Sequence, residues 1–219
     1  MTSLPQNNQT KAVENGQPQG NPLFPVFLKL NQLHTVLIGA GNIGLEKLGA
    51  ILQNSPQAKV TVIALTIIPA FEALAAEYEG VNIIQKSFSD TDLEDADIVV
   101  AATNNPELND FIRQSARQRR LLVNIADKPD LCDFYLGSIV QKGDLKIAIS
   151  TNGKSPTIAK RLKEVLNEAL PDELNTTLQQ MSKLRDTLSG DFAGKVKTLN
   201  EITSVLVSDR ERGENNSHD

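Results

Sequence analysis

A strand followed by a glycine-rich loop constrains the fold of this chain more than any other feature of its sequence. Residues 35–40 read TVLIGA, a short apolar run typical of a buried strand. The loop reads GAGNIG, so Gly39, Gly41 and Gly44 fit the pattern G-x-G-x-x-G at the start of a helix expected over residues 42–54. The first glycine permits a tight turn, the second lets the backbone approach a pyrophosphate, and the third lets the helix pack closely. We therefore expect a dinucleotide site, against the alternative of a tight turn without a ligand.

Apolar segments and helical segments alternate after this loop. The expected strands are residues 59–65, 81–85, 97–102 and 121–126, and the expected helices are Pro69–Tyr78 and Pro106–Arg119. Asn105 precedes the second helix as a plausible N-cap. The alternation predicts an α/β fold with a Rossmann-type doubly wound parallel sheet over residues 21–133.

The pattern changes after Asp127, and we expect a smaller region over residues 134–165 and a helical C-terminal domain over 166–207. The predicted elements are antiparallel strands at 134–140 and 145–150, then helices at about 155–170, 172–188 and 192–207. Residues 1–20 and 208–219 are polar and poor in apolar side chains, so we expect disordered tails there.

Composition excludes several classes of protein. The net charge of −5 argues against general binding to nucleic acid or to an anionic membrane. Cys132 is the single cysteine, which precludes an intrachain disulfide, and the N-terminal residues lack the apolar core of a signal peptide. We therefore expect a cytoplasmic protein. With only His34 and His218 as histidines, a zinc or haem site built on histidine is not expected.

Polar residues follow several predicted strands, at the edge where parallel sheets bind ligands. Asp127 directly follows the strand at 121–126, where it would accept a proton while a hydride leaves to a cofactor; the alternative is a turn aspartate before a proline. Asn104 follows the strand at 97–102. Leu65 and Thr66 end the second strand without the usual acidic residue, and no arginine is adjacent, so we favour NAD over NADP.

A loop of small polar residues, STNGKSP, leads into the helix expected after residue 155. Its backbone N–H groups, together with Lys154, Lys160 and Arg161, would suit an anion. The alternative is ordinary capping by Ser155 beside a solvated basic face.

Taken together, these motifs resemble those of a known family. The resemblance rests on GAGNIGLEKL, ALTIIPAF, AATNNPELN, NIADKPDLCDFYLGSIV and ISTNGKSPTIAKRL, in this order. The chain resembles the NAD-dependent precorrin-2 dehydrogenases, which include the yeast-type bifunctional dehydrogenase/ferrochelatase and the N-terminal half of bacterial sirohaem synthase. The resemblance implies oxidation of precorrin-2 to sirohydrochlorin by a homodimer, with residues 134–165 as the dimerisation region.

The resemblance also implies roles for individual residues. The implied NAD contacts are Gly39, Gly41, Asn42, Ile43, Gly44, Leu65 and Thr66, with Asn104 lining the same cleft. Asp127 matches the residue assigned to dehydrogenation. The implied contacts to the carboxylates of the substrate are Lys128, Lys154, Lys160 and Arg161. Two questions stay open. The chain could have a second activity, insertion of Fe²⁺ into sirohydrochlorin, and the alternative to an enzyme is a non-enzymatic NAD-sensing module.

Overall fold

The computed structural model describes residues 20–172, 174–187, 194, 196 and 197. This part of the chain forms two compact units. The first contains residues 20–138 and Ala148–Ala159, and the second contains Ile139–Ile147 and the described residues from Lys160 onward. No helix within these described residues is long and apolar enough to cross a membrane.

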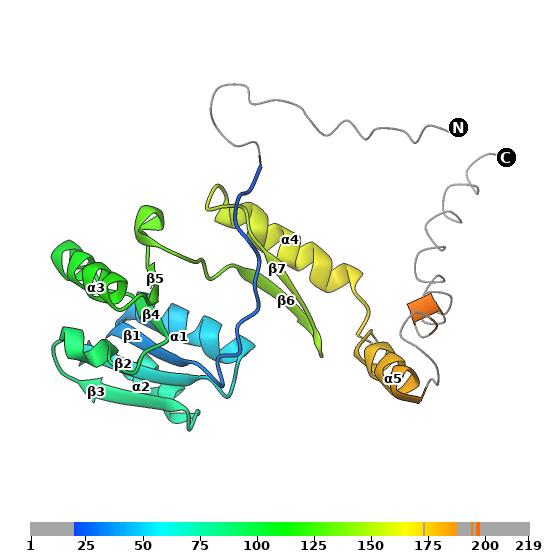
Figure 1. Ribbon diagram of the computed structural model, residues 1–219, viewed down its shortest axis with the longest axis horizontal. Coiled ribbons are helices and arrows are strands. Elements are labelled where there is room, and N and C mark those ends of the chain that lie inside the picture. Colours follow the sequence, from blue (N-terminus) through cyan, green and yellow to red (C-terminus); the bar gives the residue numbers. More distant parts are fainter. Residues whose placement is uncertain (1–19, 173, 188–193, 195, 198–219) are drawn as a thin grey trace. The chain divides into compact units, whose positions relative to one another are not determined.

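The first unit is built on a parallel sheet of five strands in the order β3-β2-β1-β4-β5 (Figure 1). The strands are β1 (His34–Ala40), β2 (Lys59–Ile67), β3 (Val81–Gln85), β4 (Ile98–Ala101) and β5 (Leu122–Ile125). All four strand pairs are parallel, with Val36 opposite Thr61 and Val99. The Rossmann-type sheet predicted from the sequence is therefore confirmed. The second strand continues two residues past its predicted end at Leu65.

Two apolar cores lie on opposite faces of this sheet, because successive strand residues point to opposite sides. Helices α1 (Asn42–Asn54) and α2 (Pro69–Ala76) pack on one face, where Leu37 meets Leu48 and Phe71. Helix α3 (Pro106–Gln118) packs on the other, where Val36 meets Ile112. The crossover helices cover both faces of the sheet. The edge formed by the carboxyl ends of the strands therefore remains open to ligands.

The segment after β5 folds back along the open edge of that strand. Asp133 exchanges two hydrogen bonds with Val123, one through its backbone N–H and one through its carboxylate. Phe134 packs against the apolar core on the α1 and α2 face of the sheet. The strand predicted over residues 134–140 was therefore placed too early. The residues between β5 and the start of β6 at Ser138 form the short 3₁₀ helix η2 (Pro129–Leu131) and this edge contact.

β6 (Ser138–Lys142) and β7 (Leu145–Ile149) form a two-stranded sheet, and only two residues separate them. A connection this short joins antiparallel strands. Helices α4 (Pro156–Ala169) and α5 (Leu174–Thr187) follow. Within the second unit, Asn175 Oδ1 accepts a hydrogen bond from the backbone N–H of Asp144 at 2.9 Å. The helix predicted at 192–207 lies almost wholly outside the described residues.

Candidate active site

The glycine loop brings three pieces of backbone into close contact. Gly39 has φ +104°, and a Cβ there would overlap the carbonyl of Ala102 at the end of β4. A Cβ at Gly44 would overlap the carbonyl oxygen of Gly39. Side chains at either position would therefore push α1 or β4 away from β1. The third glycine is required by packing, as the sequence suggested, and the first glycine is required both by its positive φ and by the close approach of Ala102.

Gly41 has a different role, because it faces open space. It is the N-cap of α1, and a Cβ there would meet no atom within 4 Å. No side chain caps this helix, and its first turn holds no acidic residue. The first N–H groups of the helix are therefore available to an anion, assisted by the helix dipole. An open approach beside uncapped N–H groups fits the pyrophosphate of a dinucleotide.

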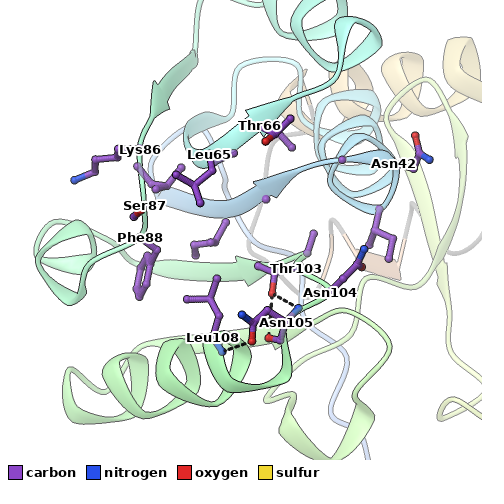
Figure 2. Close-up of a pocket in the computed structure, with 18 residues that line it drawn as sticks. Asn42, Leu65, Thr66, Lys86, Ser87, Phe88, Thr103, Asn104, Asn105 and Leu108 are labelled. Carbon is purple, nitrogen blue, oxygen red and sulfur yellow. Dashed lines mark hydrogen bonds between the residues drawn. The ribbon is translucent and has the colours of Figure 1, made fainter.

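A cavity of about 750 Å³ opens beside this loop, within the size range of small-molecule sites (Figure 2). Predicted cofactor residues that line it are Gly39, Gly41, Asn42, Ile43, Leu65, Thr66 and Asn104. Gly44 lies beneath the loop as a packing residue and is not among the lining residues. Seven of the eight predicted cofactor residues are thus brought together at one cavity.

One wall of the cavity was not predicted from the sequence. Lys86, Ser87 and Phe88 line it directly after β3, and Phe88 makes an edge-to-face ring contact with Phe111 at 5.8 Å between centroids. The available signal was their position, because polar or aromatic residues that follow a parallel strand lie at the ligand-binding edge.

The loop after β4 is held in place by side-chain hydrogen bonds. Thr103 Oγ1 donates to Asn109 Oδ1 at 2.6 Å, and Asn109 Nδ2 donates to the carbonyl of Thr103 at 3.2 Å. Asn105 caps α3 by accepting from the backbone N–H of Leu108 at 3.1 Å, as predicted (Figure 2). The exposed Asn104 is thereby presented at the cavity by a fixed loop.

Asp127 lies in a turn directly after β5. Its φ is +58°, a conformation that aspartate tolerates better than most residues, and it is exposed. β5 pairs in parallel with β4, so the Asp127 turn and the Asn104 loop leave the same edge of the sheet. Asp127 itself is not among the residues that line the cavity.

Cys132 closes the turn that carries Asp127. Its sulfur accepts a hydrogen bond from the backbone N–H of Ile125 at 3.2 Å, and its thiol lies 3.1 Å from the carbonyl oxygen of the same residue. Asn124, which is buried, donates from Nδ2 to the carbonyl of Phe134 at 2.8 Å. Burial raises the pKa of the Cys132 thiol, so it remains protonated and serves packing rather than nucleophilic chemistry.

Asp133 joins this edge to helix α3. Its Oδ2 accepts from Arg113 at 2.6 Å and from the backbone N–H of Val123 at 3.1 Å, and the Arg113 side chain is only 8% exposed. Burial of the Asp133 carboxyl raises its pKa, but the Arg113 guanidinium and the Val123 N–H outweigh this effect and lower it. The sequence did not reveal this ion pair.

The predicted basic residues do not line the cavity. Lys128, Lys154, Lys160 and Arg161 are all exposed, the first two in the first unit and the last two in the second. Ser155 caps α4, since its hydroxyl oxygen accepts from the N–H of Ile158 at 3.2 Å. Arg161 lies 3.7 Å from Glu164 on the exposed surface of its helix.

His34 has ordinary hydrogen-bond partners. Its ring nitrogens lie 2.8 Å from the carbonyl oxygen of Asp95 and from Thr61 Oγ1. Across the residues described above, no group of three or more His, Cys, Asp or Glu side chains is arranged to hold a metal ion.

The chain is similar to known protein families and to a solved structure. The family model described as "Putative NAD(P)-binding" matches residues 26–138, and the one described as "Sirohaem biosynthesis protein central" matches residues 142–168. The chain is similar to the solved structure of SirC, precorrin-2 dehydrogenase, with a TM-score of 0.67 and 26% identity, covering 82% of this chain and 89% of that one.

Curated relatives carry the name siroheme synthase. The protein from Methylococcus capsulatus is 33% identical over 74% of this chain, and that from Psychrobacter cryohalolentis is 32% identical over 80%. The protein from Salmonella typhimurium is 30% identical over 85% of this chain. The chain spans 34%, 32% and 40% of the lengths of these three relatives.

The resemblance inferred from the motifs is confirmed by these similarities. The glycine loop, the cavity beside it and the parallel sheet all fall within residues 26–138, the range matched by the first family model. That range is more than half of the 219 residues. The chain therefore belongs to this NAD(P)-binding family.

Proposed function

We propose that this chain is an NAD-dependent precorrin-2 dehydrogenase, which oxidises precorrin-2 to sirohydrochlorin in sirohaem biosynthesis. The observation that carries the proposal is the placement of the glycine-loop cavity and the Asp127 turn at one edge of the sheet. The similarity to SirC, precorrin-2 dehydrogenase, over 82% of the chain supports it.

The cavity residues would hold and orient the dinucleotide. The uncapped N–H groups at the start of α1, beside Gly41, Asn42 and Ile43, would bind the pyrophosphate. Leu65 and Thr66 at the end of β2 would contact the adenosine ribose, and Asn104 would line the other side. When bound, NAD⁺ supplies the hydride acceptor.

Asp127 would supply the proton acceptor. Dehydrogenation removes a hydride and a proton from the macrocycle, so a base is needed once the hydride has left. An exposed carboxylate on a turn fixed by Cys132 is available for this task. The proton would move to a carboxyl oxygen of Asp127 and from there to water.

The basic residues would hold the carboxylates of the substrate. Lys128 follows Asp127 directly, and Lys154, Lys160 and Arg161 supply further exposed positive charge in an otherwise acidic protein. Such groups bind carboxylates through charge-assisted hydrogen bonds. We expect the largest loss of substrate affinity when several of them are replaced together.

We also propose a cytoplasmic homodimer. Ile158, Leu162 and Val165 are 55%, 44% and 58% exposed and lie at i, i+4 and i+7 on α4. An apolar helix face of this kind is typical of an interface between chains. The single cysteine, which cannot form an intrachain disulfide, suits a reducing compartment.

Insertion of Fe²⁺ into sirohydrochlorin is the second candidate activity. The macrocycle would supply the nitrogen ligands, and the exposed carboxylate of Asp127 would accept the pyrrole protons that the metal displaces. Replacing Asp127 with asparagine therefore tests both activities.

The proposed function is tested by mixing the full chain anaerobically with precorrin-2 and NAD⁺. We expect equal amounts of NADH and sirohydrochlorin, followed by a sirohaem spectrum on addition of Fe²⁺ if chelation also occurs. Tight NAD⁺ binding with no change in precorrin-2 would contradict the proposal and favour an NAD-sensing module.

A further inference from the structure

Lys86 is the one charged residue among those that line the cavity, and it is held beside the end of β2. Its backbone N–H donates to the carbonyl of Ala64 at 3.1 Å. The preceding side chain, Gln85, donates from Nε2 to the carbonyl of Leu65, also at 3.1 Å. These hydrogen bonds hold the backbone of Lys86 next to the carboxyl end of β2. In this fold, that end of the second strand contacts the adenosine ribose.

The ammonium group of Lys86 is paired with a carboxylate. Its Nζ lies 2.5 Å from Asp92 Oδ1, and the Lys86 side chain is 42% exposed while that of Asp92 is only 9% exposed. The other oxygen, Oδ2, accepts from the backbone N–H of Ser89 at 2.9 Å and from the Ser89 hydroxyl at 3.3 Å. Asp92 is therefore held in place by the capping box of the short helix η1 (Asp90–Leu93).

The charge of Asp92 is maintained by its surroundings. Burial of its carboxyl raises the pKa, but the hydrogen bonds from Lys86 and Ser89 outweigh burial and lower it. The carboxylate is therefore ionised at neutral pH. Pulling Lys86 away would leave a mostly buried negative charge without its counter-charge, which is costly.

NAD and NADP differ by a phosphate on the 2′-hydroxyl of the adenosine ribose. Dehydrogenases that prefer NAD commonly place an acidic residue at the end of the second strand, where it bonds the hydroxyl. This chain has Leu65 and Thr66 there instead. Neither side chain carries a charge that would repel a 2′-phosphate, so a preference for NAD would have to come from a neighbouring element.

We propose that the Lys86–Asp92 ion pair sets the preference of this cavity for NAD over NADP. Asp92 already neutralises the Lys86 ammonium group that a 2′-phosphate would need, so NADP binding would have to separate the pair and leave the mostly buried Asp92 carboxylate without its counter-charge. NAD, which has no such phosphate, leaves the pair intact. The inference deepens the proposed function, because it rests on dinucleotide use at this site.

Asp92→Asn tests the proposal directly. The asparagine oxygen still accepts from the Ser89 N–H, but its uncharged amide no longer neutralises Lys86. We expect the affinity for NADP⁺ to rise by about tenfold while that for NAD⁺ changes by less than about threefold. Both are measured by calorimetric titration of the full chain with NAD⁺ and with NADP⁺, without precorrin-2.

Asp90→Asn is the matched control. Asp90 belongs to the same short helix, but its carboxylate pairs with Arg119 at 3.1 Å and not with Lys86. The change in net charge is identical, so Asp90→Asn should leave both affinities close to those of the unaltered chain. Combining Asp92→Asn with Lys86→Gln should remove the gain for NADP⁺.

Lys86→Gln alone provides a second test that leaves Asp92 and its capping box unaltered. The carboxylate would then face the cavity without its counter-charge, so the affinity for NADP⁺ should fall by about threefold more than the affinity for NAD⁺. An unchanged ratio of the two affinities in both Asp92→Asn and Lys86→Gln would overturn the proposal, as would an equal response to Asp90→Asn. An unaltered chain that binds NAD⁺ and NADP⁺ equally would overturn this inference and leave the dehydrogenase proposal standing, whereas binding of neither would overturn both.

Discussion

Two loops leave the same edge of the parallel sheet, and they are stabilised in different ways. The loop after β1 is fixed by backbone contacts, since Gly39 and Gly44 leave no room for a side chain. The turn after β5 is fixed by the side chains of Cys132 and Asp133, which bond the open edge of the strand. The first loop presents N–H groups suited to a phosphate, and the second presents the carboxylate of Asp127.

In the proposed function, this difference would separate cofactor binding from proton transfer. A loop built from backbone offers the same surface whatever the pH, which suits a cofactor that must be held in one orientation. A turn held by side chains can present a charged group without burying it. Substitutions in the two loops should therefore affect different measurements.

The largest effect is expected at the third glycine of the loop. Gly44→Ala would place a Cβ on the carbonyl oxygen of Gly39, and both are backbone positions that cannot move aside cheaply. We expect the free energy of unfolding to fall by about 3 kcal/mol or more, measured by urea denaturation. Gly41→Ala is the control. Its Cβ enters open space, so stability should change by less than about 1 kcal/mol while NAD⁺ affinity falls by about tenfold or more.

A smaller loss of stability is expected at the edge of β5. Asp133→Asn removes the charge that pairs with the buried Arg113, and an uncompensated buried charge is destabilising by about 2 kcal/mol at a partly exposed pair. Because folding lowers the pKa of Asp133, this contribution is present above the ordinary aspartate pKa of about 4 and is lost as the pH falls through the lowered value. Urea denaturation at pH 7 and at about pH 3 should show the difference from the unaltered chain shrinking in acid. A difference that grows in acid would contradict this assignment.

A still smaller loss of stability than at Asp133 is expected at Cys132. Cys132→Ala removes the acceptor for the edge N–H of Ile125, which we expect to lower the free energy of unfolding by about 1–2 kcal/mol. Cys132→Ser retains an acceptor and should lose less. If the turn is held as described, turnover of precorrin-2 should follow the same order while NAD⁺ affinity stays unchanged. Equal stability of the alanine and serine variants would argue against the sulfur as a hydrogen-bonding partner.

Much of the fold could be predicted because its signals are local in sequence. The strand at residues 35–40, the loop GAGNIG and the helix after it are adjacent, and each has a period or residue type that identifies it. The capping of α3 by Asn105 is local as well, because Asn105 accepts a hydrogen bond from Leu108, only three positions further along the chain. The cavity wall formed by Leu65 and Thr66 could be placed because strand ends in a parallel sheet meet at one edge.

Contacts between distant residues could not be predicted in this way. Arg113 and Asp133 are separated by 20 positions and meet only because α3 packs beside the edge of β5. The start of β6 was placed four residues too early, since Phe134 is apolar like a strand residue but packs against the core of the first unit instead. The ion pair between Lys86 and Asp92 was overlooked because Asp92 approaches Lys86 only through the fold of η1.

We propose that Asp127 serves the chemistry while the glycine loop serves the cofactor. The most direct test measures NAD⁺ affinity and precorrin-2 turnover on the same preparation of Asp127→Asn, with Asp130→Asn, an exposed carboxylate in the same turn, as control. We predict that Asp127→Asn lowers turnover by about 100-fold or more with NAD⁺ affinity unchanged, and that Asp130→Asn changes neither. Turnover of Asp127→Asn close to that of the unaltered chain would contradict the claim, and so would an equal loss of turnover and NAD⁺ affinity.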